Sequence, residues 1–321
     1  VYKRQVDADF SAGRVSLVAE RSILDGANDL TELNVQTGQL RMWADAVVAD
    51  TTGQPDGQQD ETAAGNQDGT IGLADTTNDA DTNDNAIDIQ VEIVAAQAAD
   101  GIYLLETDSV TVTQTDAIVV HRMNFNSTRS HITEEVLADL VTTDSGSIKL
   151  VALDGSITIE DGTSTDTGAV NTDDGIGVRA HSTADPNPAA PTATPGSILL
   201  EARAVSVGTT LGDVEINADV VTWDGTAFTS GDDIVAGRGH ITVVGDDDVH
   251  QNADLLTDGT SDPNTSDSVF EGTVVVTAFN RTVESAGVDG VIMADDTSTT
   301  TVSGHIRLAA DNESDIVLGL L

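Results

Sequence analysis

The segment Asp79-Ala80-Asp81-Thr82-Asn83-Asp84-Asn85 places carboxylate and amide oxygens at alternate positions. Calcium takes roughly six to eight such oxygens, so Asp79, Asp81, Asn83 and Asn85 are the candidate metal ligands. A calcium-binding loop of this spacing has glycine at its sixth position and glutamate at its twelfth, where this chain has Asp84 and Gln90. The other interpretation, a solvated acidic loop, is the one that we favour. We therefore expect that the chain requires no cofactor. If it binds one, calcium is the candidate.

The same segment is similar to two known calcium sites. Its first half resembles an EF-hand loop, and Asp81 to Ala86 resembles the calcium-binding linker phrase of cadherins. Ile87 stands where the cadherin phrase has proline, and no other cadherin marker accompanies it.

Other patterns in the chain point away from catalysis. Gly175-Ile176-Gly177-Val178-Arg179-Ala180 matches a dinucleotide fingerprint, but the residues that follow it will not sustain the helix that this site needs. His240 and His305 directly follow a repeat glycine, at an outward-facing position where other copies carry serine or threonine. No Gly-x-Ser-x-Gly elbow, basic cluster or distinct carboxylate pair is present. We assign no catalytic residue, and we expect no enzyme.

The charge balance limits the partners of the chain. It has 55 Asp and Glu against 13 Lys and Arg, a formal net charge of −42. Such a field repels nucleic acid and anionic membranes, so neither is an expected partner. No apolar run approaches the ~18 residues of a membrane helix, so no membrane insertion is expected in this segment. The chain has no Cys, which is compatible with secretion, because a long stacked core needs no disulfide.

A short phrase recurs along the chain: a glycine, then aliphatic residues at alternate positions, often followed by alanine. Alternation with period two predicts strands with one buried face, and the glycine suits a sharp corner. Second strands are expected at 157–159, 205–207 and 316–318, separated by turns rich in Asp, Thr, Ser, Asn and Gly. The clearest copies begin at the following glycines: Gly13, Gly38, Gly146, Gly196, Gly212, Gly239, Gly272 and Gly304. With Gly69 and Gly101 as further anchors, the intervals 13–38, 38–69, 69–101, 239–272 and 272–304 are 25 to 33 residues long, which falls in the range of one coil of a solenoid. Longer intervals, such as the 45 residues from Gly101 to Gly146, are expected to hold an insertion or a weak copy.

The chain divides into one long unit with two interruptions. Residues 1–5 are basic, unlike the rest, and are expected to derive from a sequencing adapter. Residues 6–321 are expected to form one continuous β-solenoid, interrupted by acidic or proline-rich loops at about 50–86 and 181–195. A short helix is expected at 132–140. The final run, 315–321, stops as a strand finishes, so the chain is interpreted as a fragment of a longer protein.

These phrases resemble the repeat regions of giant bacterial surface proteins, the filamentous-haemagglutinin-like β-helix adhesins and related β-strand-repeat proteins. The resemblance is carried by residues 146–160, 196–220, 239–257 and 272–318, and by the phrase 100–112. It implies an all-β fold, a right-handed parallel β-helix with long acidic loops, exported from a bacterial cell.

We therefore expect a structural or adhesive repeat segment of a large exported bacterial protein, extracellular or at the cell surface. Its partner is expected to be an unidentified surface ligand, either a glycan or a protein. One alternative is a calcium-dependent extracellular binding module, built as a β-sandwich or a loop-bearing β-helix. The third and weakest is a polysaccharide-degrading β-helix enzyme.

Overall fold

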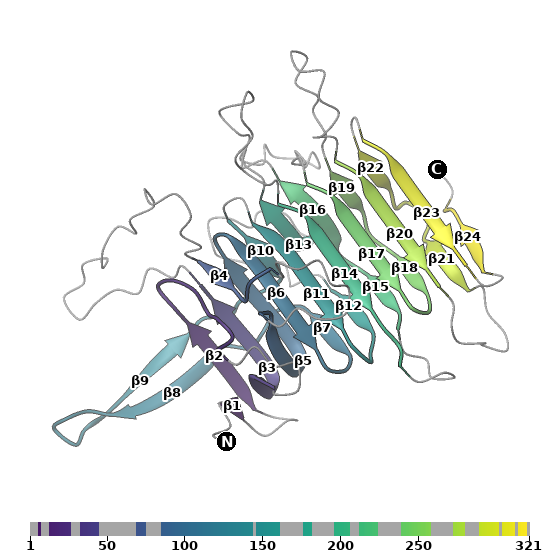
Figure 1. The fold of residues 1–321 in the computed structure, drawn as a ribbon. Helices are drawn as coiled ribbons and strands as arrows, with labels where there is room; N and C mark the ends of the chain where they lie inside the picture. Colours follow the sequence, from purple (N-terminus) through teal and green to yellow (C-terminus); the bar gives the residue numbers. More distant parts are fainter. Residues whose placement is uncertain are drawn as a thin grey trace, which may run out of the picture.

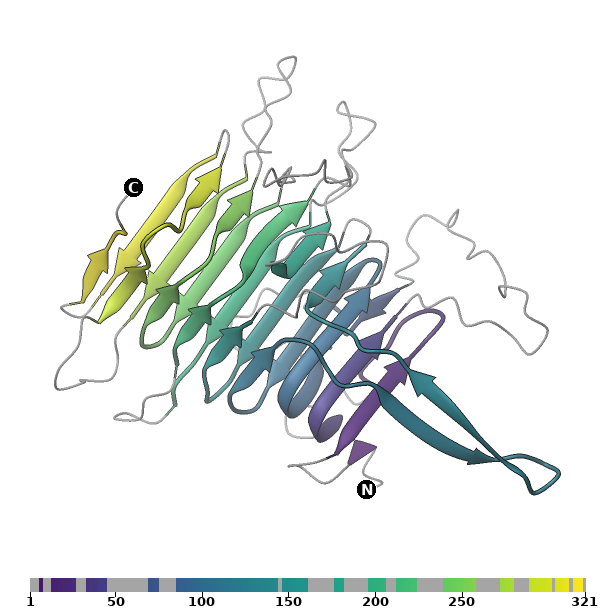
Figure 2. The ribbon, with the colours of Figure 1, turned by 180° about the vertical axis from the view of Figure 1, so that it is seen from behind.

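The repeat phrases form short β-strands that stack on one another. The computed structural model describes residues 6–7, 13–26, 33–44, 69–74, 85–143, 146–160, 176–181, 196–205, 212–223, 239–257, 272–279, 289–301, 304–311 and 314–319. In these ranges 22 strands join one sheet. Every pairing that joins them is parallel, and 13 of the strands form a parallel sheet that curves through 325° and so nearly closes on itself. The architecture is solenoid-like, as the repeats predict (Figures 1 and 2).

Each full coil contributes three strands, one to each of three faces. The first face carries β4 (Thr70–Ile71), β6 (Gly101–Glu106), β11 (Ser147–Ala152), β14 (Ile198–Ala202), β17 (Ile241–Gly245), β20 (Val274–Ala278) and β23 (Ile306–Ala310). The second carries β7 (Val110–Val112), β12 (Ile157–Ile159), β15 (Val214–Ile216), β18 (Val249–Gln251), β21 (Gly290–Met293) and β24 (Asp315–Val317). The third carries β2 (Arg14–Val18), β10 (Leu140–Thr142), β13 (Ile176–His181), β16 (Asp219–Trp223), β19 (Leu255–Thr257) and β22 (Thr299–Thr301).

In the first coils the chain is not divided into three short strands per coil. β1 (Val6–Asp7) and β2 both pair with β3 (Val35–Trp43), and β3 pairs with the twelve-residue strand β5 (Ile87–Ala98). β5 in turn pairs with β6, β7 and β10, so one strand runs past all three faces.

The length of a coil varies, whereas the register of its strands does not. Ile148, Ile198, Ile241, Val274 and Ile306 occupy the same register position on the first face. Successive members of this column are 50, 43, 33 and 32 residues apart. The extra residues are inserted at the corners, between strands.

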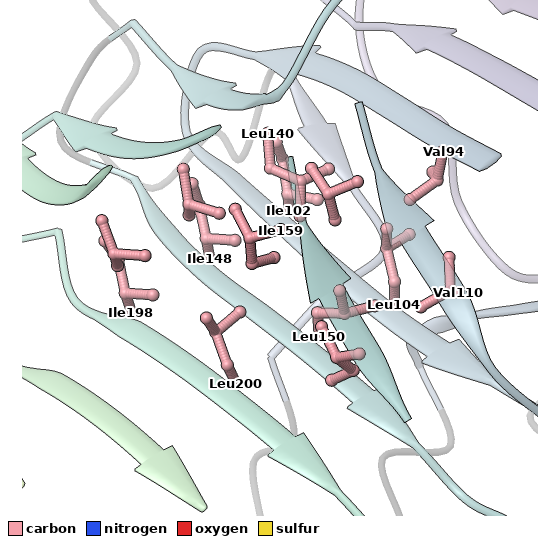
Figure 3. Packing of buried hydrophobic residues seen from close by; sticks show 14 of the residues in the cluster. Val94, Ile102, Leu104, Val110, Leu140, Ile148, Leu150, Ile159, Ile198 and Leu200 are labelled. Atoms are coloured by element: carbon pink, nitrogen blue, oxygen red, sulfur yellow. The ribbon is translucent and has the colours of Figure 1, made fainter. Parts of the chain in front are cut away.

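The core is a set of columns of aliphatic side chains that point inward. On the first face, Ile102, Ile148 and Ile198 form one column, and Leu104, Leu150 and Leu200 form the next; all six are at least 98% buried (Figure 3). Each coil exposes its apolar edge unless another coil covers it, so the core exists only when coils are adjacent. Burying each such side chain stabilises the fold by about 1.5–3 kcal/mol.

The glycines that begin the first-face strands are required by close packing. Gly146, Gly196 and Gly239 stack in one column, and Gly304 stacks on Gly272. A Cβ atom on Gly239 would overlap the carbonyl oxygen of Gly196, whereas none of these five glycines has a positive φ. Their absent side chain, rather than a special backbone conformation, therefore lets the corners of successive coils meet.

The sequence pattern assigned one glycine to the wrong face. Gly212 precedes β15 and therefore stands at the entrance to the second face, with a φ of 104°. Gly38 lies inside β3 but is aligned with Gly13, because the residues after these glycines, Arg14 and Gln39, are paired. The 25-residue interval from Gly13 to Gly38 is therefore a coil length, whereas the interval from Gly38 to Gly69 joins different faces.

Polar side chains form ladders at the same corners. On the first face, Ser147 Oγ accepts a hydrogen bond from Ser197 N–H, Ser197 Oγ accepts from His240 N–H, and His240 Nδ1 accepts from Thr273 N–H (3.1 Å each). Each of these residues precedes the first inward aliphatic of its strand. In each step the side chain of one coil satisfies the backbone donor of the next coil. The predicted outward-facing position of His240 is confirmed, since it belongs to this ladder.

The other two faces use the same arrangement. Before the second face, Ser156 N–H donates to Ser109 Oγ (3.0 Å), Asp248 N–H to Asp213 Oδ1 (3.0 Å) and Gly290 N–H to Asp248 Oδ1 (2.6 Å). Before the third, Asp254 N–H donates to Asp219 Oδ1 (2.8 Å) and Ser298 N–H to Asp254 Oδ1 (2.6 Å).

The expected helix at 132–140 is wrong. Arg129–Glu134 forms strand β9, which pairs antiparallel with β8 (Ile118–Met123), and residues 135–138 have no regular structure. This hairpin, residues 118–134, is inserted between β7 and β10 of one coil and projects from the solenoid (Figures 1 and 2). It accounts for the long interval between Gly101 and Gly146.

The remaining expectations are met in part. Strands at 157–159 and 316–318 correspond to β12 and β24, but Val205 lies in a bend and is 75% exposed. Most of the two predicted loops, 50–68, 75–84 and 182–195, lies outside the described residues, as do residues 1–5. No helix in the described ranges is both long and apolar enough to cross a bilayer.

Candidate functional site

The β8–β9 hairpin is the part of the described chain whose chemistry differs most from the rest. Residues 117–133 contain Arg122, Arg129, His121 and His131, and they contain no Asp or Glu. All 55 acidic residues therefore lie elsewhere in the chain. His121 and His131 are paired across the two strands, and their rings meet edge to face with their centroids 6.1 Å apart.

Large apolar side chains are exposed on this hairpin. Val119, Val120, Met123 and Ile132 are 42% to 73% exposed, and Phe125 at the tip is fully exposed. Side chains alternate between the two faces of a strand, so Val119 and Met123 lie on one face and Val120 on the other, opposite Ile132. Both faces of the hairpin are therefore partly apolar and open to solvent.

Polar contacts hold the tip in shape. Arg122 Nε donates to Ser130 Oγ (3.0 Å), and Ser130 Oγ donates to Asn124 Oδ1 (3.0 Å). Asn124 N–H donates to the Thr128 carbonyl (2.8 Å), and Ser127 has the left-handed φ of 65° that the turn requires. The tip is thus a defined turn that presents Phe125 outward.

The base of the hairpin is joined to the N-terminal coils at two points. Before β8, Asp116 N–H donates to Gln39 Oε1 (3.0 Å), and the carboxylate of Asp116 forms an ion pair with Arg14. This contact is exposed, so it contributes little to the free energy of folding. Inside it, Thr115 N–H donates to the Leu137 carbonyl (2.8 Å) and closes the base of the insertion.

The second point is the buried side chain of Arg41. Its Nε donates to the Glu135 carbonyl (3.0 Å), and its Nη1 lies 3.5 Å from Glu134 Oε2 and 3.3 Å from Ser16 Oγ. Its guanidinium carbon also lies 5.4 Å from the ring centre of Trp43. Burial lowers the pKa of Arg41 below its usual value, and the nearby charges of Glu134 and Glu135 oppose that shift. The buried guanidinium of Arg41 therefore holds the base of the hairpin, at the point where β9 ends.

Acidic side chains gather at the corner before the second face. Burial, together with the neighbouring charges of Asp247 and Asp213, raises the pKa of Asp248 to about 6, and the hydrogen bond from Gly290 N–H opposes the shift. The oxygens of Asp213 and Asp248 already accept backbone hydrogen bonds. Within the described residues, no group of three or more His, Cys, Asp or Glu side chains is arranged to hold a metal ion.

One buried carboxylate was missed by the sequence pattern. Glu106 is aligned with Ala152 of the next coil and occupies the inward slot that alanine fills there. Its carboxyl oxygens accept hydrogen bonds from the N–H groups of Val91 (3.1 Å) and Thr107 (2.9 Å). Burial raises the pKa of Glu106 to about 10. The side chain fills a corner of the core. The signal available in the sequence was a glutamate at a position where most of the aligned coils have alanine.

The predicted metal ligands are only partly placed. Asp79, Asp81 and Asn83 lie outside the described residues. Asn85 is described, and its backbone carbonyl accepts a hydrogen bond from Leu73 N–H (2.8 Å). The dinucleotide fingerprint falls on β13, which is a strand of the third face, so no helix begins within the motif.

Comparison with known proteins gives no family for this chain. No family model matches it, and no curated protein or solved structure matches it either.

Proposed function

We propose that this chain is a structural and adhesive segment of a large protein that bacteria export to their surface. In this proposal the solenoid is a right-handed parallel β-helix that gives reach, and its sides carry the surfaces that bind a ligand. The supporting observation is the continuity of the coils: the first face runs without interruption from β4 to β23 through parallel pairing.

The charge of the chain supports an extracellular setting. A formal net charge of −42 keeps the rod hydrated and separates it from other anionic surfaces. The ligand is proposed to be a glycan or a protein that meets the side of the rod, where the hairpin projects.

The proposal is non-catalytic. A non-catalytic role is supported by the polar side chains at the corners, which accept backbone hydrogen bonds from the next coil on all three faces. The carboxylates of Asp213 and Asp219 thus serve as acceptors within the fold.

Adhesion under flow tests the proposal directly. Beads that carry the full chain would be passed over surfaces coated with a panel of bacterial and host polysaccharides and surface proteins. We expect beads to be retained on at least one surface, equally with calcium and with a chelator. Retention that requires calcium would favour the calcium-dependent module, and shortened sugar chains in the outflow would make the protein an enzyme.

A melting experiment separates the calcium alternative independently. The full chain would be heated with and without calcium while its circular dichroism is followed. We expect the two melting temperatures to agree within about 2 °C, since a ligand that binds only the folded state raises this temperature. A larger rise with calcium would show that the folded chain binds calcium, and loss of that rise in Asp79→Asn, Asp81→Asn would place the site in the acidic segment at 79–85.

A further inference from the structure

The β8–β9 hairpin exposes more apolar surface than a solitary two-stranded element should. A two-stranded hairpin is at best marginally stable in water unless a third strand or another layer covers it. In the described residues its two strands form a sheet of their own, so each presents an outer edge with unpaired backbone groups. Its apolar side chains also remain open on both faces. These features are typical of a surface that a partner covers.

The distribution of the apolar side chains indicates what kind of surface covers them. They run from Val119 and Val120 near the base to Met123 and Phe125 at the tip. A hairpin that dips into a bilayer concentrates its apolar groups at the tip. Here they extend over the whole length, which favours a protein surface that lies along the hairpin.

The charge of the hairpin identifies the chemistry of that surface. Arg122 and Arg129 are exposed, and no acidic residue lies between 117 and 133. The complementary partner is an acidic protein surface with polar and apolar groups along a strand. The rest of this chain has that chemistry, since all 55 acidic residues lie outside residues 117–133 and the net charge is −42.

We infer that the β8–β9 hairpin docks onto the acidic solenoid of a second copy of this chain. Pairing of two hairpins with each other is disfavoured, because it would place arginines against arginines. The long-range repulsion between two acidic rods does not prevent the contact. Each six-residue strand extends about 20 Å, whereas charges more than ~8 Å apart are largely screened at physiological ionic strength. This inference concerns association between copies, so it does not depend on which ligand the rod binds.

Sedimentation velocity of the full chain over a range of concentrations tests the inference. We expect reversible association at physiological salt. The double variant Phe125→Ser, Arg129→Glu should weaken it by at least about tenfold, because it removes an apolar contact and reverses a charge. The matched control is Leu24→Ser, Arg307→Glu, which makes the same kinds of change at exposed positions on the solenoid. It leaves the hairpin unchanged and makes the solenoid more acidic, so association should be at least as strong as in the parent. A chain that stays monomeric up to ~100 µM would overturn the inference.

A capture experiment locates the receptor surface. The hairpin variant would be immobilised and exposed either to the parent chain or to itself. The variant retains an intact solenoid, so it should capture the parent but not another variant. If it captures neither, the contact is between hairpins, and the inference is wrong.

Two further measurements check that the hairpin of the variant still folds and that its partner is not a membrane. Hydrogen exchange of residues 118–134 in the monomeric variant should match the parent, which shows that the hairpin still forms. The parent would also be sedimented with vesicles of phosphatidylcholine and phosphatidylglycerol. Vesicle binding that is lost in the hairpin variant, by a chain that does not self-associate, would identify a membrane as the partner and overturn the inference.

Discussion

The buried guanidinium of Arg41 lies 3.5 Å from the carboxylate of Glu134, and this contact joins an early coil to the end of the hairpin. Its Nε also binds the carbonyl of Glu135, which is 94 residues away in the chain. The position of the hairpin is thus set by a residue of a different coil from the one that carries it.

Replacing Arg41 should release the hairpin. Arg41→Ala removes the ion pair and the bond to the Glu135 carbonyl, and we expect a loss of about 2–3 kcal/mol in the free energy of unfolding. Hydrogen exchange of residues 118–134 should accelerate more than exchange of β14 or β17. Arg14→Ala is the matched control, because the Arg14–Asp116 pair is exposed and should be worth less than about 1 kcal/mol. Equal effects of the two variants would contradict the role assigned to Arg41.

The glycine column predicts a severe effect from one added methyl group. In Gly239→Ala the new Cβ would overlap the Gly196 carbonyl oxygen and lie 2.7 Å from Thr222 Cγ2. Both neighbours belong to the packed corner, so we expect a loss of about 2–4 kcal/mol, measured by denaturant unfolding. Thr242→Ala, on the outward side of the strand that follows, should change stability by less than about 1 kcal/mol. A stable Gly239→Ala variant would show that the corners are not in close contact.

Glu106 should make the fold less stable as the pH rises. Its pKa is about 10 in the folded protein and near 4.5 in the unfolded chain, so the folded state keeps a proton that the unfolded state releases between these values. Stability from this group is therefore complete below about pH 4.5 and declines up to about pH 10. Glu106→Gln keeps an acceptor oxygen but cannot ionise.

We expect Glu106→Gln to melt on the order of 5 °C above the parent at pH 8, with the difference shrinking as the pH falls toward 4.5. The comparison between variant and parent removes the general effect of protonating the other acidic residues. A constant difference across the range would mean that the side chain stabilises the corner in the same way in both forms.

We expect ionisation of Asp248 also to lower the stability of the fold as the pH rises, but by less than ionisation of Glu106. Its pKa is raised to about 6 from 3.8, so ionisation costs stability as the pH rises through this window. Because the side chain is not fully buried, Asp248→Asn should raise the melting temperature by only about 1–3 °C at pH 7, with no gain near pH 4. Asp248→Ala serves as the control, since it also removes the acceptor for Gly290 N–H and should be destabilising at every pH. If the alanine variant behaves like the asparagine variant, the ladder bond contributes nothing.

The sequence predicted the stacked strands because their signal is local. Alternation of apolar and variable residues, as in Ser147 to Ala152, fixes which side chains point inward, and the turn residues mark the corners. The outward position of His240 followed from the same alignment of phrases. These inferences need only residues that are neighbours in the chain.

The hairpin and its anchor could not be predicted in this way. The segment that follows Arg129 has apolar residues at helical spacing, which favoured a helix, but its pairing with β8 places it in a strand. The contact between Arg41 and Glu134 depends on which coils lie side by side. The reason for the glycines also differs from the expectation at the first-face corners, where the neighbouring coil leaves no room for a side chain.

The ladders have a direction that matters for how the protein is made. On all three faces the acceptor side chain belongs to the earlier coil, and the N–H that it binds belongs to the later one. A ribosome releases the chain from its N-terminus onward. Each emerging coil therefore meets acceptors that the preceding coil has already fixed in place. Assembly can proceed vectorially, one coil at a time, with the finished part of the rod acting as the template for the next.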